Sequence, residues 1–459
     1  MARSSVPPQI TEGVIWKQLL GFFFPILLGT FFQQMYNTVD TIIVGRAVGT
    51  HALAAVGATS ALINLVSGFF MGLGSGITVL ASQAYGARDK IGVTHSIHTG
   101  MALSLVLAAI ITALGIFLGP RILVMAQTPV SCLPDAILYI QIYFSGSLAF
   151  MVYNMGSSIL RALGDSVRPT IFLIAACISN IVLDLLLVVY FRMGVAGAAW
   201  ATVLSQVISA VLVLIAMVRQ PKETRLHLKK LKIQPSLIRS ILIIGIPAGL
   251  QFITYDLSNM LIQSSVNTFG EITVAAWTAY QKTDAITWMI INSCGVAVTT
   301  FVGQNFGAQK YRRVRRSVWV SIGMSTSAVL AISLLLLFFR RPILGIYTTD
   351  QEVIRVGAYA MALILPFNFI FMPVEVFAGA MRGTGYTIVP TAITASCVCL
   401  FRILWVSFLV TRIHTLFMLS MAYPVSWAIA LIAFSVVYFR GQWLAKPIAA
   451  CGMEPEIRS

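Results

Sequence analysis

The chain has 459 residues, of which 58% are hydrophobic and 10% are charged, and its formal net charge is +16. Soluble globular proteins carry about 25% charged residues, so this composition excludes an ordinary soluble protein and predicts a polytopic membrane protein. The positive charge alone would suit a nucleic-acid partner. Most of the Lys and Arg residues, however, lie between apolar runs on one predicted side of a membrane, so we expect membrane lipids and no nucleic acid as partners.

A helix that crosses a bilayer needs about 20 apolar residues, and the sequence contains about twelve such runs. A basic, proline-bounded segment follows the sixth run. The sequence therefore predicts an all-α fold of twelve transmembrane helices in two six-helix lobes, residues 1–218 and 237–459, joined by a cytoplasmic linker at 219–236. The predicted spans are residues 16–46, 52–83, 94–118, 134–160, 168–190, 194–218, 237–267, 273–304, 317–339, 353–379, 388–411 and 415–440.

The first predicted span carries an acidic residue, Asp40, at its centre. A carboxylate at the middle of a membrane helix costs roughly 2.5–3.5 kcal/mol, so such residues mark ion or substrate pathways more often than plain packing. Tyr36 and Asn37 precede it by four and three residues and share its helix face. Pro25 lies earlier in the span and is expected to bend the helix.

Segments of the two halves repeat at a constant spacing. Gln83 matches Gln304 and Arg161 matches Arg382, each 221 residues later. Each half holds an even number of spans, so the repeats share their orientation, as in transporters whose two halves rock to open alternately to either side. Gly76 ends a stripe of glycines spaced four residues apart in the second span, which predicts close helix packing.

The fifth and sixth spans supply further oxygen ligands. Asn180 and Asp184 are four residues apart on one helix face, and Thr202 follows in the next span. With Asp40, these residues form a set of two carboxylates, an amide and a hydroxyl that suits a hard cation such as Na⁺. The two carboxylates could instead share a proton, because neighbouring carboxylates resist simultaneous ionisation. A structural role for Asn180 and Asp184 in helix bridging is the alternative.

The second half offers a different group of ionisable residues. Asp256, Asp284 and Glu375 fall within spans, as does Lys282, which is expected to pair with one of these acids. Arg355 and Arg402 fall nearer span edges. Aromatic residues nearby suit cationic ligands through cation–π contacts. The predicted substrate cavity consists of Tyr36, Asn37, Asn154, Asp256, Tyr280, Asp284 and Glu375.

The sequence is identified as resembling the MATE (multidrug and toxic compound extrusion) family over essentially its whole length, and it looks closer to the DinF-like bacterial branch. The resemblance rests on Pro25 with QQMYNTVD, on QAYGA and its repeat QNFGA, on LRALGD…RPT and its repeat MRGTG…VPT, and on NIVLD…GVAGAAWAT. It implies drug efflux in exchange for Na⁺ or H⁺ by two alternating six-helix lobes. One departure is Leu185, where many relatives carry proline.

The resemblance also implies residue roles. The first-lobe cation site of that branch maps onto Asp40, Asn180, Asp184 and Thr202, and the bending proline onto Pro25. Asp256 and Glu375 do not match the second-lobe cation site of the NorM branch.

No motif for an enzyme or an ATPase is apparent, so we expect no catalytic residues, no cofactor beyond the coupling ion, and a gradient-driven monomer. Its predicted place is the plasma (inner) membrane, with both termini cytoplasmic. The predicted cargo is amphipathic, often cationic, small molecules. The alternatives are a flippase for lipid-linked saccharides, which should have a cationic cleft, and a receptor or channel, which the internal duplication disfavours.

Overall fold

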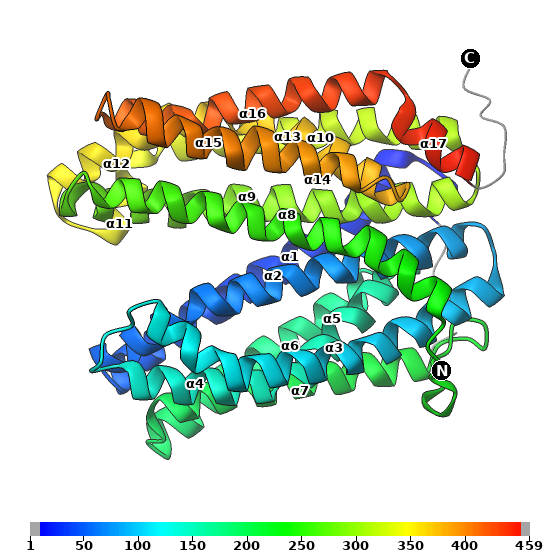
Figure 1. The fold of residues 1–459 in the computed structure, drawn as a ribbon, viewed down its shortest axis with the longest axis horizontal. Coiled ribbons are helices and arrows are strands. Elements are labelled where there is room, and N and C mark those ends of the chain that lie inside the picture. The colour runs from blue at the N-terminus through cyan, green and yellow to red at the C-terminus, as the bar shows by residue number, and fades with distance from the viewer. Residues whose placement is uncertain (1–9, 451–459) are drawn as a thin grey trace. The chain divides into compact units, whose positions relative to one another are not determined.

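The computed structural model describes residues 10–450, and every regular element in that range is helical (Figure 1). By length and composition, 11 helices can cross a membrane, and up to 12 spans result if the bent pair α4 (Leu133–Ser145) and α5 (Ser147–Ala162) counts as one. The two helices of that pair meet at 48°, next to Gly146. The predicted all-α, twelve-span fold is therefore confirmed.

The remaining elements have the following bounds. The other α-helices are α1 (Ile15–Ala47), α2 (Thr50–Gly86), α3 (Lys90–Met125), α6 (Val167–Asp184), α7 (Gly194–Val218), α8 (Pro235–Asn267), α9 (Glu271–Gly307), α10 (Tyr311–Phe338), α11 (Arg340–Tyr347), α12 (Gln351–Ile364), α13 (Asn368–Gly383), α14 (Ile388–Thr394), α15 (Phe401–Leu404), α16 (Leu416–Phe439) and α17 (Gln442–Ala450). Three segments are π-helical, η1 (Leu185–Tyr190), η4 (Ala395–Leu400) and η5 (Trp405–Val410), and two are short 3₁₀ turns, η2 (Leu228–Lys230) and η3 (Leu365–Phe367).

The described chain forms two compact units. The first contains Gly21–Ile246, and the second contains Thr11–Leu20 and the described residues from Pro247 onward. The divisions fall inside α1 and α8, so each of these helices contributes residues to both units. The two short helices α11 and α17 lie outside the predicted spans.

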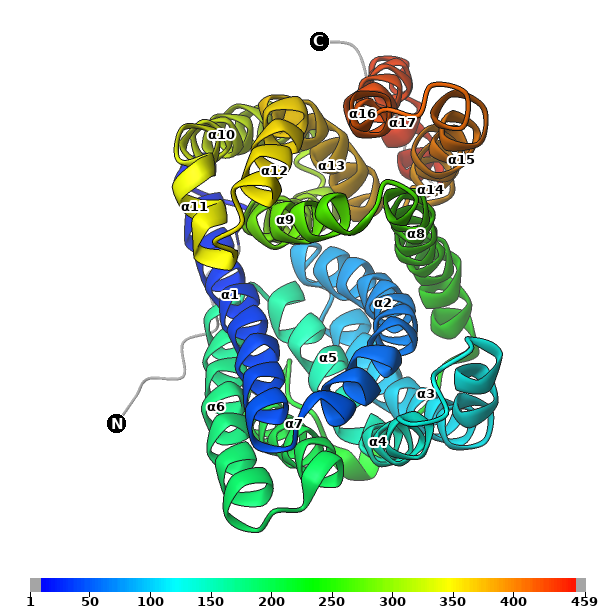
Figure 2. The same cartoon turned by 90° about the vertical axis from the view of Figure 1, so that its left-hand side faces the viewer.

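In the first unit, α5 contacts α2, α3 and α7 and lies among them (Figure 2). Its neighbour α2 also approaches the first-unit part of α8 closely. A Cβ added at Gly76 would lie 2.4 Å from the Ile241 carbonyl oxygen, and one added at Gly245 would lie 2.8 Å from the Leu73 Cα. The predicted glycine packing is confirmed at this crossing, where side chains would hold the helices apart.

The basic segment between α7 and α8 is tied to α3. Glu223 forms an ion pair of 2.5 Å with Lys90, and the backbone N–H of His227 donates to His98 Nε2 at 3.1 Å. The hydroxyl of Thr99 donates to the Lys232 carbonyl at 3.3 Å. The segment therefore folds against its own unit.

In the second unit, α13 takes the place that α5 takes in the first, since its start is 221 residues after that of α5. It contacts α9, α10 and α16. Glycines permit the close approach to α9, because a Cβ at Gly379 would lie 3.0 Å from the Gly295 carbonyl oxygen, and Thr299 donates to the Gly379 carbonyl at 3.1 Å. The corresponding pair in the first unit, Gly74 and Ser158, is also in contact.

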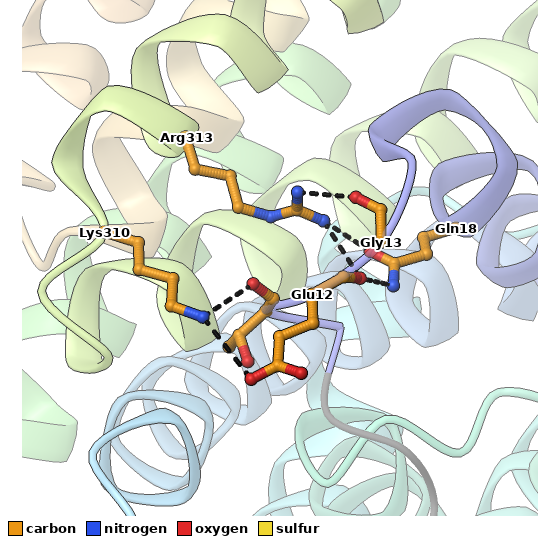
Figure 3. A network of polar contacts seen from close by, with 6 residues as sticks. Glu12, Gly13, Gln18, Lys310 and Arg313 are labelled. Atoms are coloured by element: carbon orange, nitrogen blue, oxygen red, sulfur yellow. Dashed lines mark hydrogen bonds and ion pairs between the residues drawn. The ribbon is translucent and has the colours of Figure 1, made fainter.

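The chain preceding α1 is held by the start of α10, within the second unit (Figure 3). Arg313 donates to the Gly13 carbonyl at 2.7 Å, to the Glu12 carbonyl at 3.2 Å and to Gln18 Oε1 at 2.6 Å. Lys310 donates to the Thr11 carbonyl at 3.0 Å and lies 3.8 Å from the Glu12 carboxylate. Charge-assisted bonds to backbone carbonyls thus fix the entry into α1.

Candidate ion-coupling site

Two carboxyl groups face each other inside the first unit. Asp40, on α1, and Asp184, the last residue of α6, lie within hydrogen-bonding reach of one another. Asp40 is 6% exposed and Asp184 is 0% exposed. Two ionised carboxylates this close repel each other strongly in a low-dielectric interior, so the pair favours bound protons or a cation between its oxygens.

The polar atoms around this pair lack protein partners. Asp40 Oδ1, both carboxylate oxygens of Asp184 and both side-chain polar atoms of Asn180 are buried without a hydrogen-bond partner in residues 10–450. Buried polar groups are nearly always satisfied, and each exception calls for an explanation such as an ion or a functional role. The predicted alternative, that Asn180 and Asp184 bridge helices by hydrogen bonds, finds no such bond here.

Tyrosines and a threonine close the site. Tyr36, one turn before Asp40 on α1, donates to Thr202 Oγ1 on α7 at 3.1 Å. Tyr139, on α4, is in polar contact with Thr202 and in electrostatic contact with Asp40. Its ring stacks on Tyr143 at 6.4 Å. The predicted residues Asp40, Asn180, Asp184 and Thr202 are therefore brought together.

Sequence reasoning missed Tyr139 and Tyr143. Their spacing of four residues on α4 places both rings on one face, which was the available signal. That signal is weak, because tyrosines at helical spacing occur in many packed bundles and nothing in the sequence relates this helix to α1.

Helix geometry changes directly after the acid. α6 ends at Asp184, and the π-helical segment η1 begins at Leu185, the position where the sequence departs from many relatives. π-Helical turns inside helices occur frequently at functional sites. Pro25 lies inside the continuous helix α1, and its carbonyl accepts a 2.7 Å hydrogen bond from Thr170 of α6.

In the second unit, Asp284 is enclosed by neutral donors. Asn368 donates to its Oδ1 at 2.8 Å, while Trp288 and Tyr280 donate to its Oδ2 at 3.0 and 3.2 Å. Asp284 is 4% exposed and Tyr280 is 3% exposed. Both oxygens of this carboxylate are satisfied by the protein, in contrast to those of Asp184.

The predicted partner of Lys282 was wrong. Lys282 is exposed and forms no ion pair among the described residues. Glu375 instead pairs with Arg382 at 2.5 Å, and Arg382 also donates to Gln251 at 3.3 Å. The face of α9 explains this result, because Lys282 points away from the buried side that carries Asp284.

Three other predicted cavity residues lie apart from these networks. Asn37 is exposed, so it does not share the buried position of Asp40. Asn154 is half-buried and donates to the Phe150 carbonyl of its own helix at 2.9 Å. Asp256 is half-buried, with no hydrogen bond or ion pair in the described chain. Their assignment to a substrate cavity stays a prediction.

The placement of Arg402 near a span edge was also wrong. It is only 2% exposed, and it lies in the short helix α15 between the π-helical segments η4 and η5. Arg355, by contrast, is exposed and pairs with Glu352 at 2.8 Å. A single arginine in an apolar run gives no signal of whether it faces the protein or the membrane surface.

Comparison with known proteins identifies the family. The MatE family model matches twice, at residues 25–186 and 247–407. The chain is 32% identical over 81% of its length to the probable multidrug resistance protein YpnP of Bacillus subtilis, covering 84% of that protein, and 27% identical over 95% to the probable multidrug resistance protein YoeA of the same organism, covering 95% of it.

The fold is likewise shared with solved structures. An outward-facing multidrug resistance MATE family transporter of the MOP superfamily matches with a TM-score of 0.88 and 22% identity, covering 97% of this chain and 100% of that one. The two matches of one family model also agree with the internal repeat. The chain belongs to the MatE family and is a multi-pass membrane transporter of the MATE type.

Proposed function

We propose that this protein is an antiporter that exports amphipathic, often cationic, small molecules in exchange for Na⁺ or H⁺. Its relatives YpnP and YoeA are named as probable multidrug resistance proteins, which supports drug export and not the flipping of lipid-linked saccharides. We place the protein in the plasma membrane as a monomer with both termini in the cytoplasm, in keeping with the distribution of Lys and Arg.

The observation that carries the proposal is the buried pair of Asp40 and Asp184 with unpartnered oxygens. A cation or protons arriving at this pair would relieve the repulsion between the two carboxylates. Asn180 and Thr202 would add neutral oxygens, which completes a set suited to a hard monovalent cation. Binding that stabilises one conformation of the first unit is able to favour release of cargo, because a ligand shifts a conformational equilibrium by its differential affinity.

The test is efflux of a fluorescent cationic dye from membrane vesicles under separately imposed Na⁺ and H⁺ gradients. Wild type is expected to move dye under one gradient only, which identifies the coupling ion. Asp40→Asn is expected to abolish this coupled efflux while membrane insertion stays normal. Asp256→Asn, a half-buried acid of the second unit outside the pair, serves as the matched control. Coupled efflux at wild-type rate in Asp40→Asn would contradict the proposed role.

A further inference from the structure

The second unit contains a buried arginine without an acidic partner. Arg402 is 2% exposed, and its side chain makes one printed hydrogen bond, from Nε to Ser426 Oγ at 3.0 Å. The guanidinium lies 4.2 Å from the centre of the Tyr423 ring. Its Nη2 nitrogen is buried and has no hydrogen-bond partner in the described chain.

The buried acids of this unit are engaged elsewhere. Glu375 pairs with Arg382, and both oxygens of Asp284 accept bonds from neutral donors. Arg402 takes part in none of the ion pairs formed by residues 10–450. A charged side chain within a membrane-spanning segment normally pairs with an opposite charge or marks a substrate pathway, so the free guanidinium edge requires a ligand.

The surroundings of Arg402 are rich in donors. The hydroxyl of Tyr255 is in electrostatic contact with the guanidinium, and it is also buried without a partner. Trp427, whose ring lies 5.7 Å from that of Tyr423, has a buried indole N–H with no acceptor. An indole N–H only donates. Unfilled donors around a cation are complementary to an anionic acceptor.

The internal repeat gives this location a second meaning. Tyr423 lies 221 residues after Thr202, so the ring beneath Arg402 occupies the repeat position of a residue in the carboxylate site of the first unit. The same spacing carries Asp184 to Trp405 and Asp40 to Leu261, neither of which is acidic. The second unit therefore holds the opposite charge at the corresponding place.

We propose that Arg402 forms a binding site for a carboxylate group of the transported molecule, so that the cargo includes zwitterionic amphiphiles as well as cations. The planar fork of a guanidinium matches the two oxygens of a carboxylate. Tyr255 would donate to the same group, while the aromatic rings of Tyr423 and Trp427 would contact the apolar part of the cargo. This inference rests on the proposed transport of small molecules.

The test compares two xanthene dyes that differ in one group, a free carboxylate or its ethyl ester, for binding to the purified full-length protein by fluorescence anisotropy. Wild type is expected to bind both. Arg402→Gln is expected to weaken binding of the carboxylate dye about tenfold or more, because a charge-assisted pair is lost, and to leave the ester nearly unchanged. Arg402→Lys, which keeps the charge without the fork, is expected to give an intermediate result. Arg355→Gln, an exposed arginine of the same unit, is the matched control.

The outcomes are distinguishable. Equal weakening of both dyes in Arg402→Gln, or no change in either, would overturn the carboxylate site. If Arg402→Gln does not fold, Arg402→Lys decides, because unchanged selectivity between the two dyes in that variant contradicts recognition by the fork. Binding of the ester alone by wild type would overturn the site and leave the proposed function intact. Binding of neither dye would count against both.

Discussion

Asp184 is fully buried beside another carboxyl group, and none of its oxygens has a donor partner in the described chain. Such a group costs stability, because burial removes its hydration without returning hydrogen bonds. Asp284, equally buried in the second unit, is held by three donors. The contrast indicates that Asp284 is structural and that the Asp40–Asp184 pair is kept for a ligand.

Replacing Asp184 by asparagine is therefore expected to stabilise the ion-free protein. An unsatisfied buried group costs about 1–3 kcal/mol, and more when charged, so the Tm should rise by about 2 °C or more. Asp40 would then lack its repelling neighbour. Thermal unfolding in detergent, followed by tryptophan fluorescence, measures this change, with Asp256→Asn as the control.

The coupling ion supplies the second half of this test. A ligand that binds only the folded protein raises the Tm with its concentration, so the ion should raise the Tm of wild type and leave that of Asp184→Asn unchanged. A variant less stable than wild type without the ion, or one with the same ion-induced rise, would contradict the account.

At the scale of elements, the sequence predicted what length and hydropathy determine. The spans follow from apolar runs, and the pairing of Asn180 with Asp184 follows from helical spacing. The π-helical segment that begins at Leu185 did not follow, because its residues are uniformly apolar and its backbone depends on the packing of α6 on α7. The exposed face of Lys282 was also not predictable, since the rotation of α9 is set by its neighbours and not by its own sequence.

The crossing of α2 and α8 gives an element-scale prediction. Gly76→Ala is expected to lower stability by about 1–3 kcal/mol, as overpacking does, because the added Cβ would lie 2.4 Å from the Ile241 carbonyl oxygen. Gly57, on the same helix, has nothing within 4 Å of an added Cβ and is exposed. Gly57→Ala should stabilise by roughly 0.5–1 kcal/mol.

Thermal unfolding of the two alanine variants side by side measures the difference. A Gly76→Ala protein at least as stable as the Gly57→Ala protein would show that the helices do not approach at Gly76.

At the scale of the whole molecule, the chain passes between the two units within α1 and α8. Any rearrangement of one unit with respect to the other therefore requires a change within these helices. Pro25 and Pro247 each remove a backbone donor there, Pro25 in α1 and Pro247 at the point where α8 enters the second unit. The repeat and the twelve spans were readable from the sequence, whereas these division points depend on tertiary contacts.

The anchoring of the chain before α1 gives a prediction at this scale. Arg313→Gln should remove the hydrogen bonds to Gly13, Glu12 and Gln18. Because each bond contributes about 0.5–1.5 kcal/mol, amide hydrogen exchange in Thr11–Leu20 should accelerate at least about fivefold. Arg316→Gln, an exposed arginine on the same helix, should leave exchange unchanged. Equal exchange in both variants would show that Arg313 does not hold this segment.

The central claim is exchange of cargo for an ion at the Asp40–Asp184 pair, and thermodynamic coupling must operate in both directions. The most direct measurement uses proteoliposomes loaded with a fluorescent cationic dye and with no ion gradient, with an indicator of internal pH or Na⁺. In wild type, outward dye flux is predicted to drive one of these ions inward, and Asp40→Asn is predicted to show no ion movement. Dye flux without ion movement in wild type, or ion movement of equal size in Asp40→Asn, would contradict the account.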